Sequence, residues 1–468
     1  MSLRAILALL LLALTACTTL PPPGEWGREI SPERSPSRTP VNRPEAPEIR
    51  KLDWPQALRV SRERNPSLRA AHARLQRAQA IVDETKALFY PAVDTRGAAI
   101  SFLEAADFRG RTGSNVSEQS TRSRFFTGRG AEIYSAGLDV TYPIFDGGDA
   151  YYASRAAEAF REAERQLSTN VLDELEVRVS TAFLNALLAE GGVRIAEEAL
   201  RFSTEQETQA ASREKAGEGL RVDTLRFATR ASEERQALNR AQAERRVQLA
   251  ILSELLGVTV ADDVELVRPE KLLDFVEGDL TAMALENRAD VRAMRAHVEE
   301  AGLRLRREES SWWPAVNVFG SYGFISLDDL DLGTDKDEFQ IGAALAMNLF
   351  EGGATSARIN ARKQQLEELH SQERELALAV ERQVRQFGLE FEVARKNVEV
   401  SRETVRLAEE VLTRVAARYR EGEAQVLDVT EAELQRTRAQ LSFLRSRVNS
   451  LLSQVRLRRA LGLGLLRE

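Results

Sequence analysis

The chain has one cysteine and three histidines among its 468 residues. A single thiol excludes a disulfide framework and a multi-cysteine metal site. His72, His297 and His370 are too widely scattered to give the ligand spacing of a zinc site. The sequence also lacks the G-x-S-x-G, H-E-x-x-H and Walker glycine-loop motifs of common enzyme classes. We therefore expect no enzymatic activity, no metal and no cofactor.

Long apolar runs are also missing, apart from one near the N-terminus. Ala5–Leu14 forms an apolar run of about ten residues behind Arg4, which suits a secretory signal but is about half a transmembrane span. The rest of the chain offers no candidate transmembrane helix, so we expect any membrane crossing to use a barrel. The formal net charge of -7 gives no electrostatic footprint for a nucleic-acid partner.

The one cysteine follows this apolar run. Residues 14–17 read LTAC, which resembles a bacterial lipobox. The resemblance implies a lipoprotein signal peptide at 1–16, with Cys17 as the first mature residue and its acyl chains as a membrane anchor. Thr18, in place of aspartate, implies sorting to the outer membrane. An ordinary signal peptide with an incidental cysteine is the alternative. Residues 17–50 hold eight prolines, so we expect a lipidated, extended tether without a core of its own.

Two parts of the chain match without a gap at an offset of 205 residues. YPIFDGG at 142–148 corresponds to MNLFEGG at 347–353. Repeats of this length are whole structural halves, so we divide the chain after the tether into two repeats, 51–270 and 271–468. The first repeat is longer because of a polar, Gly- and Arg-rich insert around 103–132, whose role the sequence does not indicate.

Each repeat is predicted to contain a β-hairpin, at about 89–146 and 312–351. Phe339, Ile341 and Leu345 alternate with polar or small residues, a period-two pattern that places one apolar face on a strand. Runs of about ten residues match the length of transmembrane strands. Four strands per chain are fewer than the roughly eight of the smallest closed barrel, so closure requires several chains.

Long helical patterns surround the hairpins. The segments that follow the strands contain no proline and would be roughly 100 Å long at 1.5 Å per residue. Charges over most of their faces favour coiled-coil packing over a globular core. Each repeat is therefore predicted to contain a helix, a hairpin, a long helix and a returning helix. The predicted helices are 56–88, 149–216 and 223–256 in the first repeat, and 280–311, 354–421 and 428–461 in the second.

The lipobox, the duplicated halves, the two alternating hairpins and the recurrence of GEGLRVDTL (217–225) as GEAQVLDVTEAEL (422–434) together resemble the TolC-like outer-membrane efflux proteins, and most closely their lipidated OprM-type branch. The resemblance covers the chain from Cys17 to about Leu466. It implies an α+β membrane protein in which three protomers form one twelve-stranded β-barrel in the bacterial outer membrane. The barrel would continue as a long α-helical tunnel into the periplasm.

The same resemblance implies a passive exit duct of a tripartite efflux system for small molecules. The implied partners are two further copies of the chain, a periplasmic adaptor protein, an inner-membrane pump of the resistance-nodulation-division (RND) type and outer-membrane lipid. A periplasmic coiled-coil or tethering lipoprotein without a pore is the alternative, but such a protein does not need four alternating strands. The exported substrate and the particular pump are not readable from the sequence.

Two groups of glycine-rich positions follow from the resemblance. The first marks the bends between barrel and tunnel, where glycine accepts backbone conformations that other residues resist. The second marks the tips of the helical hairpins, which the family uses to contact the adaptor. Simple helix C-capping is the alternative role of the tip glycines. The bends are Gly147, Gly148, Gly352 and Gly353, and the tips are Gly217, Glu218, Gly219, Gly422 and Glu423.

A gate at the closed end of the tunnel is also implied. Asp428 and Glu431 lie three residues apart on one helix face, and threefold symmetry would turn them into two rings of carboxylates that constrict the duct and select cations. A solvated acidic face is the alternative. Tyr419 matches a family tyrosine that helps to hold the aperture shut. Ala424 replaces the family's arginine, so we consider Arg418 or Arg420 as substitutes, with Asp223 as the natural acceptor.

Overall fold

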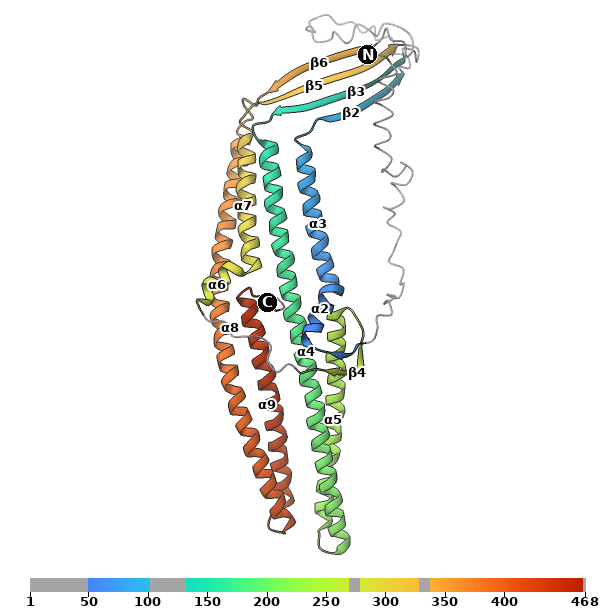
Figure 1. The fold of residues 1–468 in the computed structure, drawn as a ribbon, viewed down its shortest axis with the longest axis vertical. Helices are drawn as coiled ribbons and strands as arrows, with labels where there is room; N and C mark the ends of the chain where they lie inside the picture. The colour runs from blue at the N-terminus through green and yellow to red at the C-terminus, as the bar shows by residue number, and fades with distance from the viewer. Residues whose placement is uncertain (1–48, 102–131, 269–277, 328–336, 466–468) are drawn as a thin grey trace, which may run out of the picture. The chain divides into compact units, whose positions relative to one another are not determined.

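The same order of elements occurs twice along the chain: two helices, a β-hairpin, a long helix and a returning helix (Figure 1). The first repeat consists of α2 (Trp54–Arg64), α3 (Pro66–Ala87), β2 (Ala92–Ser101), β3 (Glu132–Phe145), α4 (Asp149–Ala216) and α5 (Arg221–Leu256). The second consists of α6 (Leu280–Asn287), α7 (Ala289–Ser310), β5 (Ala315–Leu327), β6 (Asp337–Ala346), α8 (Ala354–Arg420) and α9 (Val426–Ala460). The ends of the four long and returning helices lie within two residues of the sequence prediction.

The computed structural model describes residues 49–101, 132–268, 278–327 and 337–465. The signal peptide, Cys17, almost all of the tether and almost all of the insert around 103–132 lie outside these residues. The described residues belong to one compact unit, Ile49–Glu468, so the two repeats pack together as a single body.

The strands β2, β3, β5 and β6 form one antiparallel sheet in that order, with β2 and β6 at its edges (Figure 1). The register places most of the apolar residues that alternate in β3, β5 and β6 on one face, as the period-two pattern predicts, whereas Phe319 lies on the other face. On the edge strand β6, Phe339, Ile341 and Leu345 are 70%, 71% and 69% exposed. Within the described residues, the sheet therefore has no cover for its apolar face and no partner at either edge.

The predicted helices at 56–88 and 280–311 are each broken in the structure, and the expectation of one continuous helix was wrong in both repeats. Asn65 (φ -68°, ψ 127°) and Arg288 (φ -66°, ψ 129°) adopt the same extended conformation at equivalent positions. Pro66 explains the first break, because a residue before proline avoids the helical region. No proline follows Arg288, which instead donates hydrogen bonds to Asp290 and Gln383.

Two further differences concern strands. A short parallel pair, β1 (Ile49–Leu52) and β4 (Val260–Leu266), was not predicted. β6 ends at Ala346, so Met347–Phe350 continues the apolar pattern beyond the strand, whereas β3 in the first repeat extends to Phe145. The repeated motif therefore lies at the end of a strand in the first repeat, but after the end of the strand in the second.

The helix α4 packs against α3, α5, α7 and α9 and so lies at the centre of the helical part. Its first half buries mainly alanine, whose small side chain allows neighbouring helices to approach closely. The pairs α4–α5 and α8–α9 form two hairpins whose tips lie at the end opposite the sheet (Figure 1). No helix in the described part of the chain is both long enough and apolar enough to cross a membrane.

The glycine pairs between strand and helix provide a matched test. A Cβ on Gly147 (φ 69°) would lie 2.7 Å from Trp313 Cβ, whereas a Cβ on Gly352 (φ 59°) would meet nothing within 4 Å. Gly352→Ala should cost only the left-handed strain, about 1–2 kcal/mol. Gly147→Ala should add an overpacking cost of about 1–3 kcal/mol. Thermal unfolding followed by circular dichroism should give a lower midpoint for Gly147→Ala, and equal midpoints would contradict this account.

Candidate functional site

Both bends between the sheet and the long helices use two consecutive left-handed glycines. Their φ angles are 69° and 92° at Gly147 and Gly148, and 59° and 88° at Gly352 and Gly353. Residues with a Cβ rarely adopt this conformation, which explains why the Gly-Gly pair occurs in both repeats. The structure therefore places all four predicted bend glycines immediately before a long helix, where the chain has left the sheet.

The acidic residue before the first glycine pair caps α4. Asp146 accepts backbone hydrogen bonds from Gly148 and Ala150, both at 2.8 Å, through its two carboxylate oxygens. Its carbonyl also accepts from Asp149 N at 3.3 Å. Free amides at a helix N-terminus favour a negative charge, so this carboxylate stabilises the bend.

The equivalent acid in the second repeat, Glu351, is one methylene longer and bonds side chains instead. It accepts from Thr355 Oγ1 at 2.7 Å and from Arg358 Nη2 at 3.0 Å, and it also contacts Asn348. The hydrogen bonds from Thr355 and Arg358 lower the pKa of Glu351. The backbone turn is the same as in the first repeat, with Ala354 N donating to the carbonyl of Glu351 at 3.1 Å.

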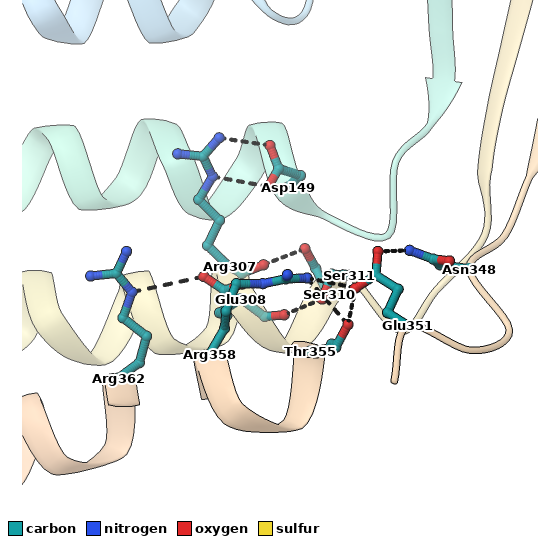
Figure 2. Close-up of polar contacts among 10 residues, drawn as sticks. All are labelled: Asp149, Arg307, Glu308, Ser310, Ser311, Asn348, Glu351, Thr355, Arg358 and Arg362. Atoms are coloured by element: carbon teal, nitrogen blue, oxygen red, sulfur yellow. Dashed lines mark hydrogen bonds and ion pairs between the residues drawn. The ribbon is translucent and has the colours of Figure 1, made fainter. Parts of the chain in front are cut away.

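Adjacent residues at the end of α7 hold the starts of both long helices (Figure 2). Arg307 donates to both oxygens of Asp149 in α4, at 2.9 and 3.0 Å. Glu308 accepts from Arg358 in α8 at 2.8 Å and pairs with Arg362 at 3.8 Å. The hydrogen bond to Asp149 raises the pKa of Arg307. This network, the α7 clamp, consists of these five residues and fixes α4 and α8 relative to each other below the sheet.

The predicted tips are helix C-caps in the structure. Gly217 (φ 75°) donates to Glu214 O at 3.0 Å, and Gly422 (φ 81°) donates to Tyr419 O at 3.1 Å. In both turns the next residue reaches one position further back, the Schellman pattern. The tip residues are exposed, except for Gly219, which is partly buried. The C-cap role therefore holds, and adaptor contact stays a prediction.

The two tips contact each other around Tyr419. Its ring packs edge-on against Phe227 of α5, with centroids 5.9 Å apart. Arg213 of α4 lies 5.5 Å above the same ring and donates to Tyr419 O at 3.3 Å and Arg420 O at 2.6 Å. Burial and the charge of Asp223 raise the pKa of Tyr419. We call Arg213, Phe227 and Tyr419 the tip latch, because together they join the first hairpin to the second.

The arginines considered as substitutes at the tip behave differently from expectation. Arg418 pairs with Glu423 of its own turn at 3.7 Å, and Arg420 donates to Ala416 O at 3.3 Å. Among the described residues, neither makes a hydrogen bond or ion pair with Asp223. The linking guanidinium belongs instead to Arg213, on the opposite hairpin.

The candidate gate residues lie just beyond the second tip. Asp428 is exposed and accepts from Gln425 N at 2.9 Å, as one half of a capping box that begins α9. Glu431 is exposed one turn later on the same helix. The structure thus gives Asp428 a capping task in addition to the predicted gating role, and it leaves both carboxylates accessible in the single chain.

A buried carboxyl, Glu433, was missed by the sequence analysis. It is 2% exposed, and burial together with the charge of Glu234 on α5 raises its pKa to about 8. Its Oε1 lies 3.5 Å from Arg436 Nη2 but accepts no hydrogen bond. Arg230 is already paired with Glu234. Position 433 lies on the same helix face as the buried Val426 and Val429, as the helical spacing indicates. This spacing could have identified Glu433 as buried, whereas the number of acidic residues in the sequence could not.

Neither network resembles a catalytic or metal centre. No group of three or more potential metal ligands occurs in the described ranges. The geometry gives two bends with left-handed glycine pairs at one end and two mutually packed tips at the other. The chain shares this fold, in which a sheet is joined to paired helical hairpins, with the MtrE outer membrane channel of Neisseria gonorrhoeae in its open state (TM-score 0.74, 19% identity, 89% of this chain and 90% of that chain).

Sequence comparisons lead to the family. The profile of the outer membrane efflux protein family matches residues 57–258 and 280–463. Alkaline protease secretion protein AprF of Pseudomonas aeruginosa is 26% identical over 283 residues, or 59% of this chain and 58% of AprF. Outer membrane efflux protein BepC of Brucella suis is 24% identical over 324 residues, or 69% of this chain and 70% of BepC. The match thus spans less than two thirds of AprF. The chain belongs to the outer membrane efflux protein family.

Removal of the Arg213 guanidinium should loosen the tip latch. Arg213→Gln loses two charge-assisted hydrogen bonds to carbonyls, a partly exposed contact for which we expect roughly tenfold faster amide exchange. Hydrogen–deuterium exchange of residues 415–424 measures this directly. Arg221→Gln is the control, because the hydrogen bond that Arg221 makes among the described residues is to Glu214 within its own tip, at 3.5 Å. Equal exchange in the two variants would contradict the latch.

Glu433 should make the packing of α9 against α5 depend on pH. Its pKa is raised in the folded state, so its protonated form is compatible with burial at low pH, and stability is lost as pH rises from about 4.5 through about 8. Glu433→Gln keeps the shape without the charge. Its thermal midpoint should exceed that of the wild type by an amount that grows over this range and is constant above it. Glu431→Gln, an exposed neighbour, should show no such trend; a flat difference for Glu433→Gln would refute the assignment.

Proposed function

We propose that the protein is the outer-membrane exit duct of a tripartite efflux system and that it conducts small molecules passively to the exterior. Family membership and the fold shared with outer-membrane channels support this function. The single observation that carries it is the β-sheet, whose apolar face and two edges have no partner within the described residues. A periplasmic scaffold would have no use for such a sheet.

Three copies of the chain would satisfy the sheet. Each contributes four strands, and edge β6 of one copy pairs with edge β2 of the next to close a twelve-stranded barrel whose apolar face contacts lipid. The helices support the same assembly. α8 exposes Val393, Val400 and Leu407 at intervals of seven residues, the spacing of a coiled-coil seam. A groove beside this seam, lined by Leu389 and Val393 of α8 and Asn449 of α9, would accept a helix of the neighbouring copy.

The resemblance of residues 14–17 to a lipobox supports an anchor on Cys17 in the outer membrane, with the helical hairpins in the periplasm. The exposed tips at Gly217–Gly219 and Gly422–Glu423 would then face the adaptor. An RND-type pump fits the lipidated branch. The name of AprF, which refers to protease secretion, favours a protein conduit as the second candidate. Deletion of the gene distinguishes the two functions. A duct for small molecules predicts sensitivity of the cells to small toxic compounds, whereas a protein conduit predicts loss of a secreted protein.

Opening would require the two hairpins of each copy to separate at their tips. Closed, the tip latch holds α4 against α8, and Asp428 and Glu431 of three copies form two carboxylate rings around the axis. Such rings attract cations and repel one another, so the duct selects cations while it is narrow. The adaptor and pump supply the energy for opening, and the duct itself carries out no chemistry.

Single-channel recording in a planar bilayer tests the duct. The wild type should give small, cation-selective openings, and Asp428→Asn/Glu431→Gln should give larger and less selective ones. Asparagine is chosen because it keeps an acceptor for Gln425 N and so preserves the cap of α9. Glu392→Gln, an exposed change on α8, should leave selectivity unchanged. A wild type without conductance would contradict the duct, and an unchanged double variant would contradict the gate.

A further inference from the structure

A cavity of about 830 Å³ lies where the two repeats meet, between α4 and the helices α7, α8 and α9. It lies beside the last turns of α9 and within the first half of α4, away from both the bends and the tips. Its walls contain five arginines but only two carboxylates, Glu174 and Asp290. The arginines are Arg178 of α4, Arg288 at the break between α6 and α7, Arg382 of α8, and Arg456 and Arg459 of α9.

One of the two carboxylates, Asp290, is already paired with an arginine of the cavity wall. Asp290 accepts hydrogen bonds from Arg288 at 3.0 and 2.6 Å, and Arg288 is only 5% exposed. Arg288 also donates to Gln383 at 2.8 Å. Burial acts to raise the pKa of Asp290, but Arg288 and then Arg459 lower it overall. The ion pair of Arg288 with Asp290 therefore contributes no net charge to the cavity.

The other arginines have little compensation. Arg459 donates to Asn170 of α4, which is neutral. Arg178, Arg382 and Arg456 are exposed at the rim, and none makes a hydrogen bond or ion pair with an acidic side chain of the described residues. Among the described lining residues, Glu174 is the one carboxylate left to balance the other four guanidinium groups. These charges come from three different helices, so their mutual repulsion is a cost that a bound anion would remove.

We propose that this cavity binds a small anion that carries two or more phosphate-type groups. The planar guanidinium fork matches the oxygen atoms of phosphate through paired hydrogen bonds, and several such forks line this cavity. The volume is in the range of small-molecule sites and larger than a single oxyanion needs. An anion bound to Arg178, Arg382 and Arg456 connects α4 of the first repeat to α8 and α9 of the second. It therefore stiffens the seam along which the two hairpins would separate.

Isothermal titration calorimetry of the full-length protein in detergent, with inorganic pyrophosphate at low ionic strength, tests the site. The proposal predicts saturable binding of one pyrophosphate per chain. Arg382→Gln/Arg456→Gln should weaken it at least tenfold, because hydrogen bonds to charged groups are among the stronger polar contacts. Raising the salt concentration should also weaken binding.

The matched control is Arg385→Gln/Arg445→Gln. It removes the same number of charges from exposed positions on the same two helices, but outside the cavity, and should retain wild-type affinity. Arg178→Gln, a single change on α4, provides a second variant if the first does not fold, and should also weaken binding. Absence of saturable binding to the wild type would overturn the proposal. Equal weakening in the cavity and control variants would overturn it as well, because it would indicate non-specific attraction to positive charge.

Discussion

The unfinished β-sheet is the constraint on which the rest of the structure depends. In water, a four-stranded sheet normally buries one apolar face, yet this sheet leaves Phe339, Ile341 and Leu345 largely exposed at an edge strand. Backbone groups at both edges must also be paired if the sheet enters lipid. A single chain neither covers the apolar face nor pairs the edges. Further copies of the chain would pair the edges and lipid would cover the apolar face, so we expect the sheet to be completed only by assembly in a membrane.

The helical part then has to leave the sheet at a fixed angle and keep two long hairpins in register. The left-handed glycine pairs supply the bend, and the α7 clamp supplies the register, since Arg307 and Glu308 bind the starts of α4 and α8 separately. At the other end the hairpins are joined by the aromatic contact of Phe227 with Tyr419 and by two hydrogen bonds from Arg213. Ion pairs near the sheet and fewer contacts at the tips would suit the proposed duct, in which only the tips separate.

Much of the fold could be predicted from the sequence, because its elements occur in both repeats. The offset of 205 residues exposed both Gly-Gly bends and both tip turns, and period-two alternation gave the faces of the sheet. The break at Arg288 could not be predicted, because no proline marks it and one of the contacts of Arg288 is to Gln383, 95 residues away. The contacts of Arg213 and of the α7 clamp could not be predicted for a similar reason. A charged residue on a helix looks the same whether it faces water or a partner from another repeat.

The most direct test of the account joins the two free edges of the sheet. Ala98→Cys in β2 and Ala344→Cys in β6 place thiols on the same, less apolar face, as the register indicates. A short bismaleimide should then connect neighbouring copies in the membrane and give covalent dimers and trimers on a denaturing gel, with no larger species. Either cysteine alone should give no trimer. Monomers only, or a ladder that continues beyond the trimer, would contradict a closed barrel built from three chains.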